Sequence, residues 1–146
     1  MTISRELLTP VLAYELLPLI AANQAATGRD ESARLQWSVF YELEAGGALC
    51  LLIARVDGVA VGYCAHAAIV SHSTGNLAAV CLGIYLDPAH RAMAKALVRE
   101  AEAHASAAGC QTIEFAVPHL SNAGAFFETV MGYGCRELVM AKGLPE

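Results

Sequence analysis

The stretch DPAHRAMAKALVRE, residues 87–100, separates an apolar run from a helical pattern and decides the fold. Asp is a strong N-cap and Pro favours the first helical position, so Asp87-Pro88 predicts that a helix begins here. Apolar residues then recur at spacings of three and four up to Gly109, which predicts a helix over 88–108. The face of this helix that we expect to be buried carries Met93, Leu97, Val98, Ala101 and Ala105.

Strand-length apolar runs lie on both sides of this helix, at residues 77–87 and 110–118. A strand, a crossover helix and a second strand permit parallel pairing of the two strands. Two further apolar runs precede them, at 48–56 and 59–71, and the Asp57-Gly58 pair between these is typical of a two-residue hairpin. The three runs before the long helix are therefore expected to form an antiparallel meander.

Helices are predicted at both ends of the chain. Apolar residues at helical spacing indicate a helix over 9–26, with Thr9 as its N-cap, and a second helix over 32–46. Near the C-terminus, we expect a short helix over 121–134 and a last strand over 135–144.

The resulting order of elements is ααβββαβαβ. This order predicts the α/β class, with a mixed and mostly antiparallel sheet flanked by helices. A chain of 146 residues without a linker is expected to form one domain over 1–146. Within it, residues 1–47 form a helical part and residues 48–146 contain the sheet.

The composition restricts the class of protein. Of the residues, 56% are hydrophobic and 16% are charged, which is typical of a globular domain with a sizeable core. The net charge of −5 gives no electrostatic basis for nucleic-acid binding, and the apolar runs are too short to cross a membrane. The first residues lack the pattern of a signal peptide, so we expect a cytoplasmic protein. Exposed sheet edges and the high apolar content favour a homodimer.

The spacing of cysteine and histidine argues against a metal site. The five cysteines include no CxxC pair, and the five histidines show no HxxxH or HxH spacing. We therefore expect free thiols, mostly buried, in a reducing compartment, and no bound metal.

Four stretches of the sequence form a recognisable series. They are DGVAVGY (57–63), GIYLDPAHR (83–91), AKALVREAEAHASAAGCQTIEFAV (94–117), and SNAGAFFETVMGYG (121–134) with MAKGL (140–144). In order and spacing, this series resembles the GNAT superfamily, the acyl-CoA-dependent N-acyltransferases, and in particular the short GNAT-like proteins of phage genomes. The resemblance covers the chain from about residue 48 to its end, whereas the first 47 residues match only in being helical.

The resemblance implies a binding site for acetyl-CoA. In GNAT proteins the fourth and fifth strands diverge, and the pantetheine arm lies in the gap between them. The pyrophosphate binds backbone N–H groups at the start of the long helix, where the helix dipole favours an anion. An amide of the fourth strand polarises the acetyl carbonyl, which here implies the amide of Tyr85 or Leu86.

The family's phosphate-binding signature, Gln/Arg-x-x-Gly-x-Gly/Ala, fits the sequence in two registers. One register places it on residues 91–96, and the other places it on 89–94 with a loop two residues shorter. We prefer the second, because the first puts Arg99 and Glu100 on the buried face, at a cost on the order of several kcal/mol. The cofactor contacts implied in this region are Arg91, Ala92, Met93, Ala94 and Lys95.

Two alternatives stay open at this turn. Arg91 and Lys95 lie one helical turn apart and can supply positive charge to a phosphate, or they can form a solvated face. The carboxylate of Asp87 would compete with a pyrophosphate for the same amides.

Two glutamates are candidate catalytic residues. The position of the family's tyrosine acid in the last helix holds Glu128, and Glu114 lies within an apolar strand. A glutamate acts as an acid or base only in an environment that favours its protonated form, and an exposed or partnered side chain is the alternative for both. Asn122 matches an asparagine that contacts the pantetheine in the family, or else it caps the helix with Ser121. Tyr133 falls on the family's aromatic packing position and is expected in the core.

Trp37 and His72 are candidate substrate contacts. Trp37 and the neighbouring Phe40 lie on the helix that borders the acceptor cleft in the family, and His72 lies by a predicted turn. Packing of the aromatic rings and solvation of the histidine are the alternatives.

The predicted function is transfer of an acetyl group from acetyl-CoA to the primary amine of a small molecule or peptide. The alternative is a catalytically degenerate GNAT-fold protein that serves as a CoA-binding or protein-interaction module.

Overall fold

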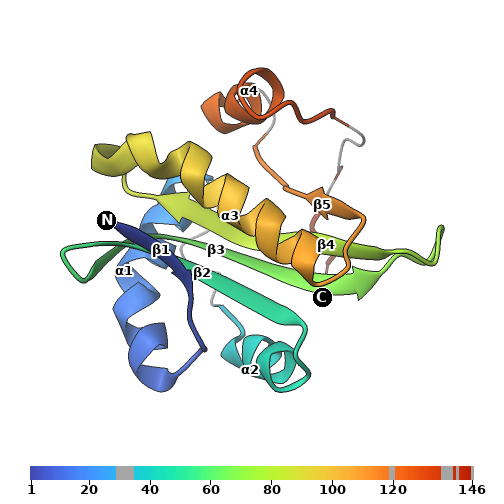
Figure 1. The fold of residues 1–146 in the computed structure, drawn as a ribbon, viewed down its shortest axis with the longest axis horizontal. Helices are drawn as coiled ribbons and strands as arrows, with labels where there is room; N and C mark the ends of the chain where they lie inside the picture. Colours follow the sequence, from blue (N-terminus) through green and yellow to red (C-terminus); the bar gives the residue numbers. More distant parts are fainter. Residues whose placement is uncertain (29–34, 119–120, 136–139, 141, 146) are drawn as a thin grey trace. The chain divides into compact units, whose positions relative to one another are not determined.

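A five-stranded sheet organises the first of two compact units, Met1–Ala116 and Val117–Glu146 (Figure 1). The computed structural model describes residues 1–28, 35–118, 121–135, 140 and 142–145. Within these residues the strands follow the order β1-β2-β3-β4-β5, antiparallel except for the parallel pair of β4 and β5. The strands are β1 (Thr2–Arg5), β2 (Leu49–Val56), β3 (Val59–Val70), β4 (Leu77–Leu86) and β5 (Thr112–Glu114).

The strands β2, β3 and β4 form the predicted antiparallel meander. Asp57 and Gly58 connect β2 to β3 with φ angles of 49° and 79°. A tight hairpin turn requires this left-handed backbone, which glycine adopts without strain. The fold class is thus confirmed as α/β, with a mixed and mostly antiparallel sheet.

The predicted order of elements lacked β1 and is corrected here. The four residues of β1 include one large apolar side chain, that of Ile3, and therefore give no strand pattern in the sequence. They pair with β2, Thr2 opposite Arg55 and Arg5 opposite Leu52. Pairing with an already buried strand thus determines the conformation of this segment, and part of the N-terminal 47 residues belongs to the sheet.

Helices cover both faces of the sheet (Figure 1). The helices α1 (Pro10–Ala26) and α2 (Trp37–Ala45) lie on one face, and α3 (Ala94–Ala107) lies on the other. Thr9 caps α1 as predicted, because its Oγ1 accepts the N–H of Leu12 at 3.2 Å. The helix predicted over 32–46 begins at Trp37, and residues 32–34 lie outside the described part of the chain. None of the described helices is long and apolar enough to cross a membrane.

Alternation along β2 and β3 divides the core between the two faces. On one face, Leu51 and Tyr63 belong to a cluster that includes Leu12 of α1. On the other face, Leu52 and Cys64 pack in a cluster with Leu97 and Ala101 of α3. Each fully buried leucine contributes about 2 kcal/mol relative to an exposed one. The apolar side chains of β2 and β3 therefore hold helices on both faces of the sheet.

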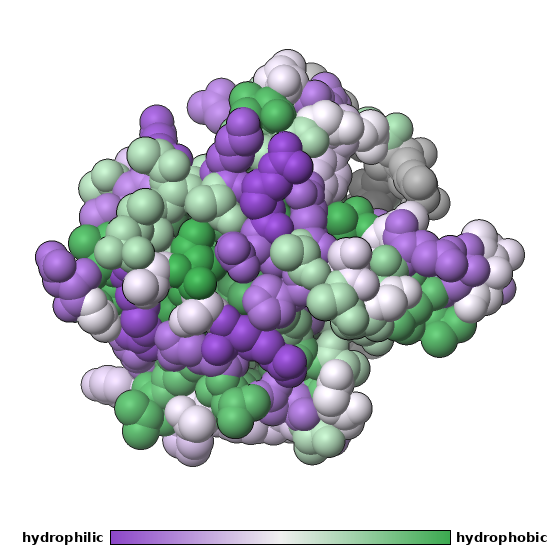
Figure 2. Space-filling view, in the orientation of Figure 1, coloured by the Kyte–Doolittle hydropathy of each residue, from purple (hydrophilic) through white to green (hydrophobic). Residues whose placement is uncertain are grey.

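The long helix predicted over 88–108 is confirmed on its buried face but is divided at its start. A short 3-10 helix, η1 (Pro88–Met93), leads into α3, and His90 between them has the non-helical angles φ −115° and ψ 24°. Gly109, with a φ of 86°, follows the end of α3. Figure 2 views the face that α3 covers, where hydrophilic side chains lie among weakly apolar ones. The buried residues are the five that the spacing predicted: Met93, Leu97, Val98, Ala101 and Ala105.

The second unit contains α4 (Asn122–Thr129). The Oγ of Ser121 accepts a backbone N–H at 3.1 Å, so Ser121 is the N-cap of this helix. The ring of Phe127 is buried and meets the ring of Tyr133 edge-on at a centroid distance of 5.1 Å, which supports the packing role of Tyr133. The strand predicted over 135–144 falls largely on residues outside the described part of the chain, namely 136–139 and 141.

Arg55 on β2 is hydrogen-bonded to two carboxylates, one on α1 and one in the segment between β1 and α1. Its Nε donates to Glu6 Oε1 at 2.7 Å, and its Nη1 donates to Glu15 Oε1 of α1 at 2.6 Å. Its Nη2 donates to both carboxylates at 3.0 Å, and Nη1 also reaches the carbonyl of Gly58 at 2.9 Å. The hydrogen bond from Arg55 lowers the pKa of Glu15. Arg55 on β2 therefore fixes the start of the chain and α1 to the β2–β3 hairpin.

His66 on β3 is buried without a hydrogen bond. It is 3% exposed, and neither ring nitrogen has a partner among the residues that the structure describes. Burial lowers the pKa of His66, and the positive charges of His104 and Arg5 lower it further. The imidazole is therefore neutral at neutral pH, and its protonation would place an uncompensated charge in the core.

We predict that the protein loses stability as the pH falls below about 6.5, the ordinary pKa of histidine. The unfolded chain binds a proton at that pKa, whereas folded His66 binds it only at lower pH, so the free energy of unfolding decreases as the pH falls through this interval. Urea unfolding at pH 7.5 and pH 5.5 measures the decrease. The His66→Leu variant should show a smaller decrease in the free energy of unfolding. The His72→Gln variant, changed in an exposed turn, should show the same decrease as the unaltered protein. Equal decreases in all three proteins would contradict the prediction.

Candidate functional site

The strand β4 continues past the end of its pairing with β5. The parallel register joins Ala78, Ala79 and Val80 of β4 to Thr112, Ile113 and Glu114 of β5. On its other edge, β4 stays paired with β3 up to Leu86. The segment 81–86 therefore has one edge that is not hydrogen-bonded to a neighbouring strand among the described residues. We call this segment the open edge of β4.

Backbone hydrogen bonds show which amides face the open edge. Asp87 N–H donates to the carbonyl of Val61 on β3 at 2.9 Å, and the register continues with Leu86 opposite Gly62. Hydrogen-bonding directions alternate along an antiparallel strand, so the N–H of Tyr85 points to β3. The N–H groups of Ile84 and Leu86 point the opposite way, to the open edge. Such amides can donate to the polar groups of an extended ligand.

The turn from β4 into α3 is partly occupied by its own hydrogen bonds. Asp87 Oδ1 accepts the N–H of Ala89 at 2.8 Å, and the carbonyl of Asp87 accepts the N–H of His90 at 2.8 Å. The carboxylate of Asp87 thus already accepts an amide at the turn where the resemblance places the pyrophosphate. The N-terminus of α3 itself has no side-chain cap, and the amide of Ala94 donates to the carbonyl of Arg91.

The side chains at this turn divide into buried and exposed ones. Met93 is buried, whereas Arg91, Ala92 and Lys95 are exposed and Ala94 is half-buried. An anion here would therefore meet two cations and small side chains that let the backbone approach.

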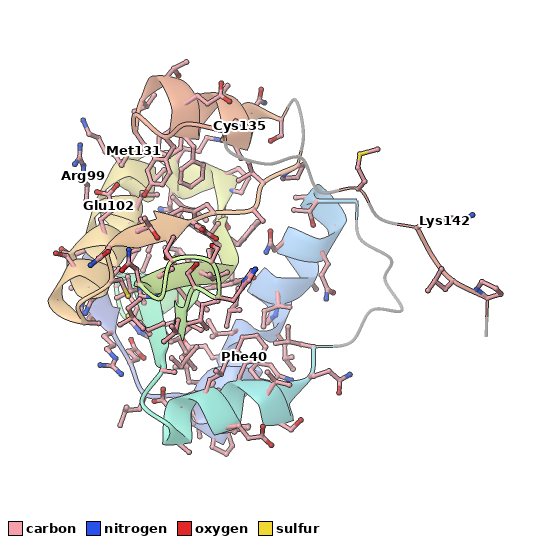
Figure 3. The ribbon with its side chains drawn as sticks, turned by 90° about the vertical axis from the view of Figure 1, so that its right-hand side faces the viewer. Phe40, Arg99, Glu102, Met131, Cys135 and Lys142 are labelled. Carbon is pink, nitrogen blue, oxygen red and sulfur yellow. The ribbon has the colours of Figure 1, made fainter. Side chains whose placement is uncertain are left out.

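The helical phase distinguishes the two registers of the phosphate-binding signature. Leu97 and Val98 are buried, while Arg99 and Glu100 are exposed. Arg99 lies on the outer face of α3, where its Nη1 is 3.5 Å from Glu102 Oε2 (Figure 3). The helix thus has the apolar phase that favours the register on 89–94, the residues that form most of η1.

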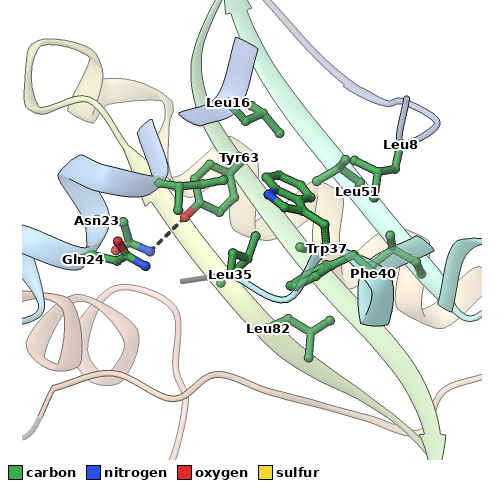
Figure 4. Close-up of a pocket in the computed structure, with 14 residues that line it drawn as sticks. Leu8, Leu16, Asn23, Gln24, Leu35, Trp37, Phe40, Leu51, Tyr63 and Leu82 are labelled. Carbon is green, nitrogen blue, oxygen red and sulfur yellow. Dashed lines mark hydrogen bonds between the residues drawn. The ribbon is translucent and has the colours of Figure 1, made fainter. Parts of the chain in front are cut away.

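A pocket lies on the opposite face of the sheet, between α1, α2 and the strands β2, β3 and β4 (Figure 4). It has about 590 Å³ of atom-free space, part of which is open solvent. Its lining residues are Leu8, Leu16, Ile20, Asn23, Gln24, Leu35, Trp37, Phe40, Leu49, Leu51, Tyr63, Ala65, Leu82 and Gly83.

Tyr63 is a pocket residue to which the sequence analysis gave no role. Its hydroxyl accepts a hydrogen bond from Asn23 Nδ2 of α1 at 3.0 Å. Its ring lies against Gly83, where an added Cβ would be 3.3 Å from Tyr63 Cε2. The alternation of side chains along β3 could have indicated this position, because it puts Tyr63 on the same face as the buried Ala65. The partner Asn23 could not be found in this way, because it lies 40 residues away in the sequence.

The predicted substrate contacts lie in different places. Trp37 lines the pocket, and its ring centroid is 6.2 Å from that of Phe40, the aromatic neighbour named with it. His72 is exposed in the turn between β3 and β4 and is not a lining residue of the pocket. This turn is at the end of β4 opposite to Leu86.

The predicted acid–base residues are both exposed. Glu114 is the last residue of β5, and Glu128 lies on α4 of the second unit. Asn122, the predicted pantetheine contact, is the exposed first residue of α4, next to the capping Ser121.

Cys50 and Cys64 are buried free thiols, whereas Cys135 is exposed. The thiol of Cys64 donates a hydrogen bond to Cys81, which raises the pKa of Cys64 and lowers that of Cys81. In the part of the chain that the structure describes, no three His, Cys, Asp or Glu residues are arranged to hold a metal ion.

The open edge of β4, followed directly by a helix start, is the arrangement that the resemblance to the GNAT superfamily implies. The sequence profile of the acetyltransferase (GNAT) family matches residues 15–133, and the chain belongs to this family. A search of curated proteins found no match.

Several solved structures with the same fold are named as acetyltransferases. A ribosomal-protein-alanine N-acetyltransferase from Brucella melitensis biovar Abortus 2308 is 23% identical, with a TM-score of 0.77 and full coverage of both chains. An aminoglycoside 6'-N-acetyltransferase from Acinetobacter haemolyticus is 21% identical, with a TM-score of 0.72 and coverage of 100% of this chain and 99% of that one. AAC(6')-Iy, in complex with the bisubstrate analogue CoA-S-monomethyl-acetylneamine, is 16% identical, with a TM-score of 0.74 and 99% coverage of each chain. At these identities, the likeness establishes the shared fold.

Proposed function

We propose that the protein transfers the acetyl group of acetyl-CoA to a primary amine. Membership of the acetyltransferase (GNAT) family supports the reaction class, and the solved relatives named above include acetyltransferases of ribosomal-protein and aminoglycoside amines. The observation that carries the proposal is the open edge of β4, because its outward amides can hold an extended acyl-thioester substrate.

The residues of the first unit fit acetyl-CoA in two places. The amides of Ile84 and Leu86 at the open edge would bind the pantetheine arm and the acetyl carbonyl. The side chains of Arg91 and Lys95, with the uncapped N-terminus of α3, would bind phosphate. The N–H groups that Asp87 occupies are not part of this proposed site.

Acetyl transfer requires the protein to stabilise the negative charge that develops on the carbonyl oxygen of the acetyl group. The amine nitrogen forms a bond to the acetyl carbon, the carbon–sulfur bond breaks, and the thiolate of CoA takes up a proton. The N–H of Leu86 would donate to the carbonyl oxygen as negative charge develops on it, which is worth about 3 kcal/mol for a well-placed donor. Of the two amides expected from the sequence, we select Leu86 because the N–H of Tyr85 points to β3.

The groups that move protons are a separate proposal. An amine reacts in its neutral form, so a base or water must first accept the ammonium proton. Glu114 and Glu128 stay candidates for this role and for protonating the thiolate. Both side chains are exposed, so water can replace either of them.

We predict that Arg91→Ala combined with Lys95→Ala weakens acetyl-CoA binding about tenfold, which corresponds to about 1.4 kcal/mol. Both side chains are exposed, so their loss removes charge near the phosphates without opening the core. Calorimetric titration measures the affinity, and Arg99→Ala, one turn further along α3, is the control with unchanged affinity. An unchanged affinity in the double variant rejects the phosphate role. Absence of binding to the unaltered protein at millimolar acetyl-CoA favours the interaction module instead.

A further inference from the structure

The pocket beside the open edge has an uncharged lining. Its fourteen described residues include no Asp, Glu, Lys, Arg or His. Two carboxylates of the same face, Glu6 and Glu15, are held by Arg55, and Glu44 accepts the N–H of Leu8 at 3.2 Å. An amine that carries a second ammonium group into the pocket would therefore lose the hydration of that group. None of the described lining residues would offer it a carboxylate.

Most polar side-chain groups of the pocket gather at one end, and the indole nitrogen of Trp37 lies between the two ends. Figure 4 shows Asn23, Gln24 and the Tyr63 hydroxyl together, with Leu8 and Leu51 at the other end. The Tyr63 hydroxyl already accepts a hydrogen bond from Asn23. The remainder of the wall consists of aliphatic and aromatic surface, which favours an apolar occupant.

The pocket meets the proposed reaction site along β4. Leu82 and Gly83 line the pocket, and both belong to the open edge that begins after the last β4–β5 pair. The register of β3 and β4 shifts here, between the Ala65–Gly83 and His66–Cys81 pairs, so Leu82 is the extra residue of a β-bulge. An amine placed at the open edge can thus extend its substituent into the pocket.

We infer that the acceptor is a monoamine whose other end is a single aromatic ring or a short alkyl chain, held between the side chains of Trp37, Phe40 and Tyr63. This inference rests on the proposed acetyl transfer. The apolar lining favours an uncharged end group, and the described lining residues offer no carboxylate to the further ammonium groups of polyamines and aminoglycosides.

Two amines that differ only in a terminal charge test the inference. Release of the CoA thiol from acetyl-CoA is measured with pentylamine, 1,5-diaminopentane, 2-phenylethylamine and neamine. We expect kcat/KM to be at least about tenfold higher for pentylamine than for 1,5-diaminopentane, because the second ammonium group would be desolvated without a partner. The kcat/KM for 2-phenylethylamine should be similar to that for pentylamine, and the kcat/KM for neamine should be similar to that for 1,5-diaminopentane.

A pair of variants on α2 localises the effect. Phe40→Ala should raise KM for pentylamine and 2-phenylethylamine about tenfold and leave kcat within about twofold, because it removes binding surface remote from the reacting atoms. Val39→Ala, on the same helix but half exposed and outside the pocket, should change neither constant. If Phe40→Ala does not fold, Phe40→Leu should show a smaller increase in KM for the same two amines.

The outcomes separate the inference from the function on which it rests. A diamine or neamine acetylated as well as pentylamine overturns the inference and leaves acetyl transfer intact. Equal KM values for the Phe40 variants and the unaltered protein overturn it as well. If acetyl-CoA binds and none of the four amines is acetylated, acetyl transfer to simple amines fails, and the inference fails with it.

Discussion

We expect Arg55→Ala to lower the free energy of unfolding by about 2–3 kcal/mol, the range for hydrogen bonds to charged groups. The variant loses five hydrogen bonds and leaves the carboxylates of Glu6 and Glu15 close together without their cation. The side chain of Arg55 is 19% exposed, so solvent replaces only part of this interaction. Thermal unfolding should show a midpoint lowered by about 6–12 °C.

Arg99→Ala is the matched control for this loss. Arg99 is 60% exposed and pairs with Glu102 on the surface of α3 at 3.5 Å, so its removal should cost less than about 0.5 kcal/mol. Arg55→Lys should recover part of the loss, because an ammonium group cannot donate to both carboxylates in the same planar arrangement. Equal midpoints for the Arg55→Ala and Arg99→Ala proteins would show that Arg55 does not hold α1 to the sheet.

We expect Gly62→Ala to reduce kcat about 100-fold, the loss typical of one missing or displaced oxyanion donor. A Cβ at residue 62 would lie 2.7 Å from the carbonyl oxygen of Tyr85 and 3.2 Å from the Cα of Leu86. Because these atoms are backbone, β4 must move at the residue whose N–H we assign to the acetyl carbonyl. The same overpacking should cost about 2 kcal/mol of stability.

Gly134→Ala is the control for the Gly62 variant, since no atom of the described residues lies within 4 Å of the added Cβ there and its φ is not left-handed. Its stability and kcat should equal those of the unaltered protein. Steady-state kinetics below the unfolding midpoint separates the two effects of Gly62→Ala. A destabilised Gly62→Ala protein that keeps its full kcat would remove Leu86 from the catalytic proposal.

The elements set by local chemistry were predictable from the sequence. The spacing of Met93, Leu97 and Val98 gave the buried face of α3, because apolar burial selects the helical phase. Asp57-Gly58 gave the hairpin, because few residue pairs adopt a left-handed backbone at low cost. In contrast, β1 was missed, since four residues pair with β2 without any local pattern.

The site was less predictable because it depends on contacts between distant segments. The apolar run 110–118 suggested a long strand, yet β5 consists of Thr112–Glu114, and the open edge exists because that pairing ends early. The pocket combines residues of five elements, so its uncharged lining corresponds to no motif. Trp37 was named from the family resemblance, whereas Tyr63 and Asn23 required the structure.

A crystal structure of the protein grown with acetyl-CoA tests the central claim most directly. The account predicts density for the pantetheine arm along residues 81–86 of β4, with the thioester oxygen about 3 Å from the nitrogen of Leu86. The phosphates should lie beside Arg91 or Lys95. Saturating acetyl-CoA with no density along this edge, or with the edge covered by the protein's own side chains, would contradict it.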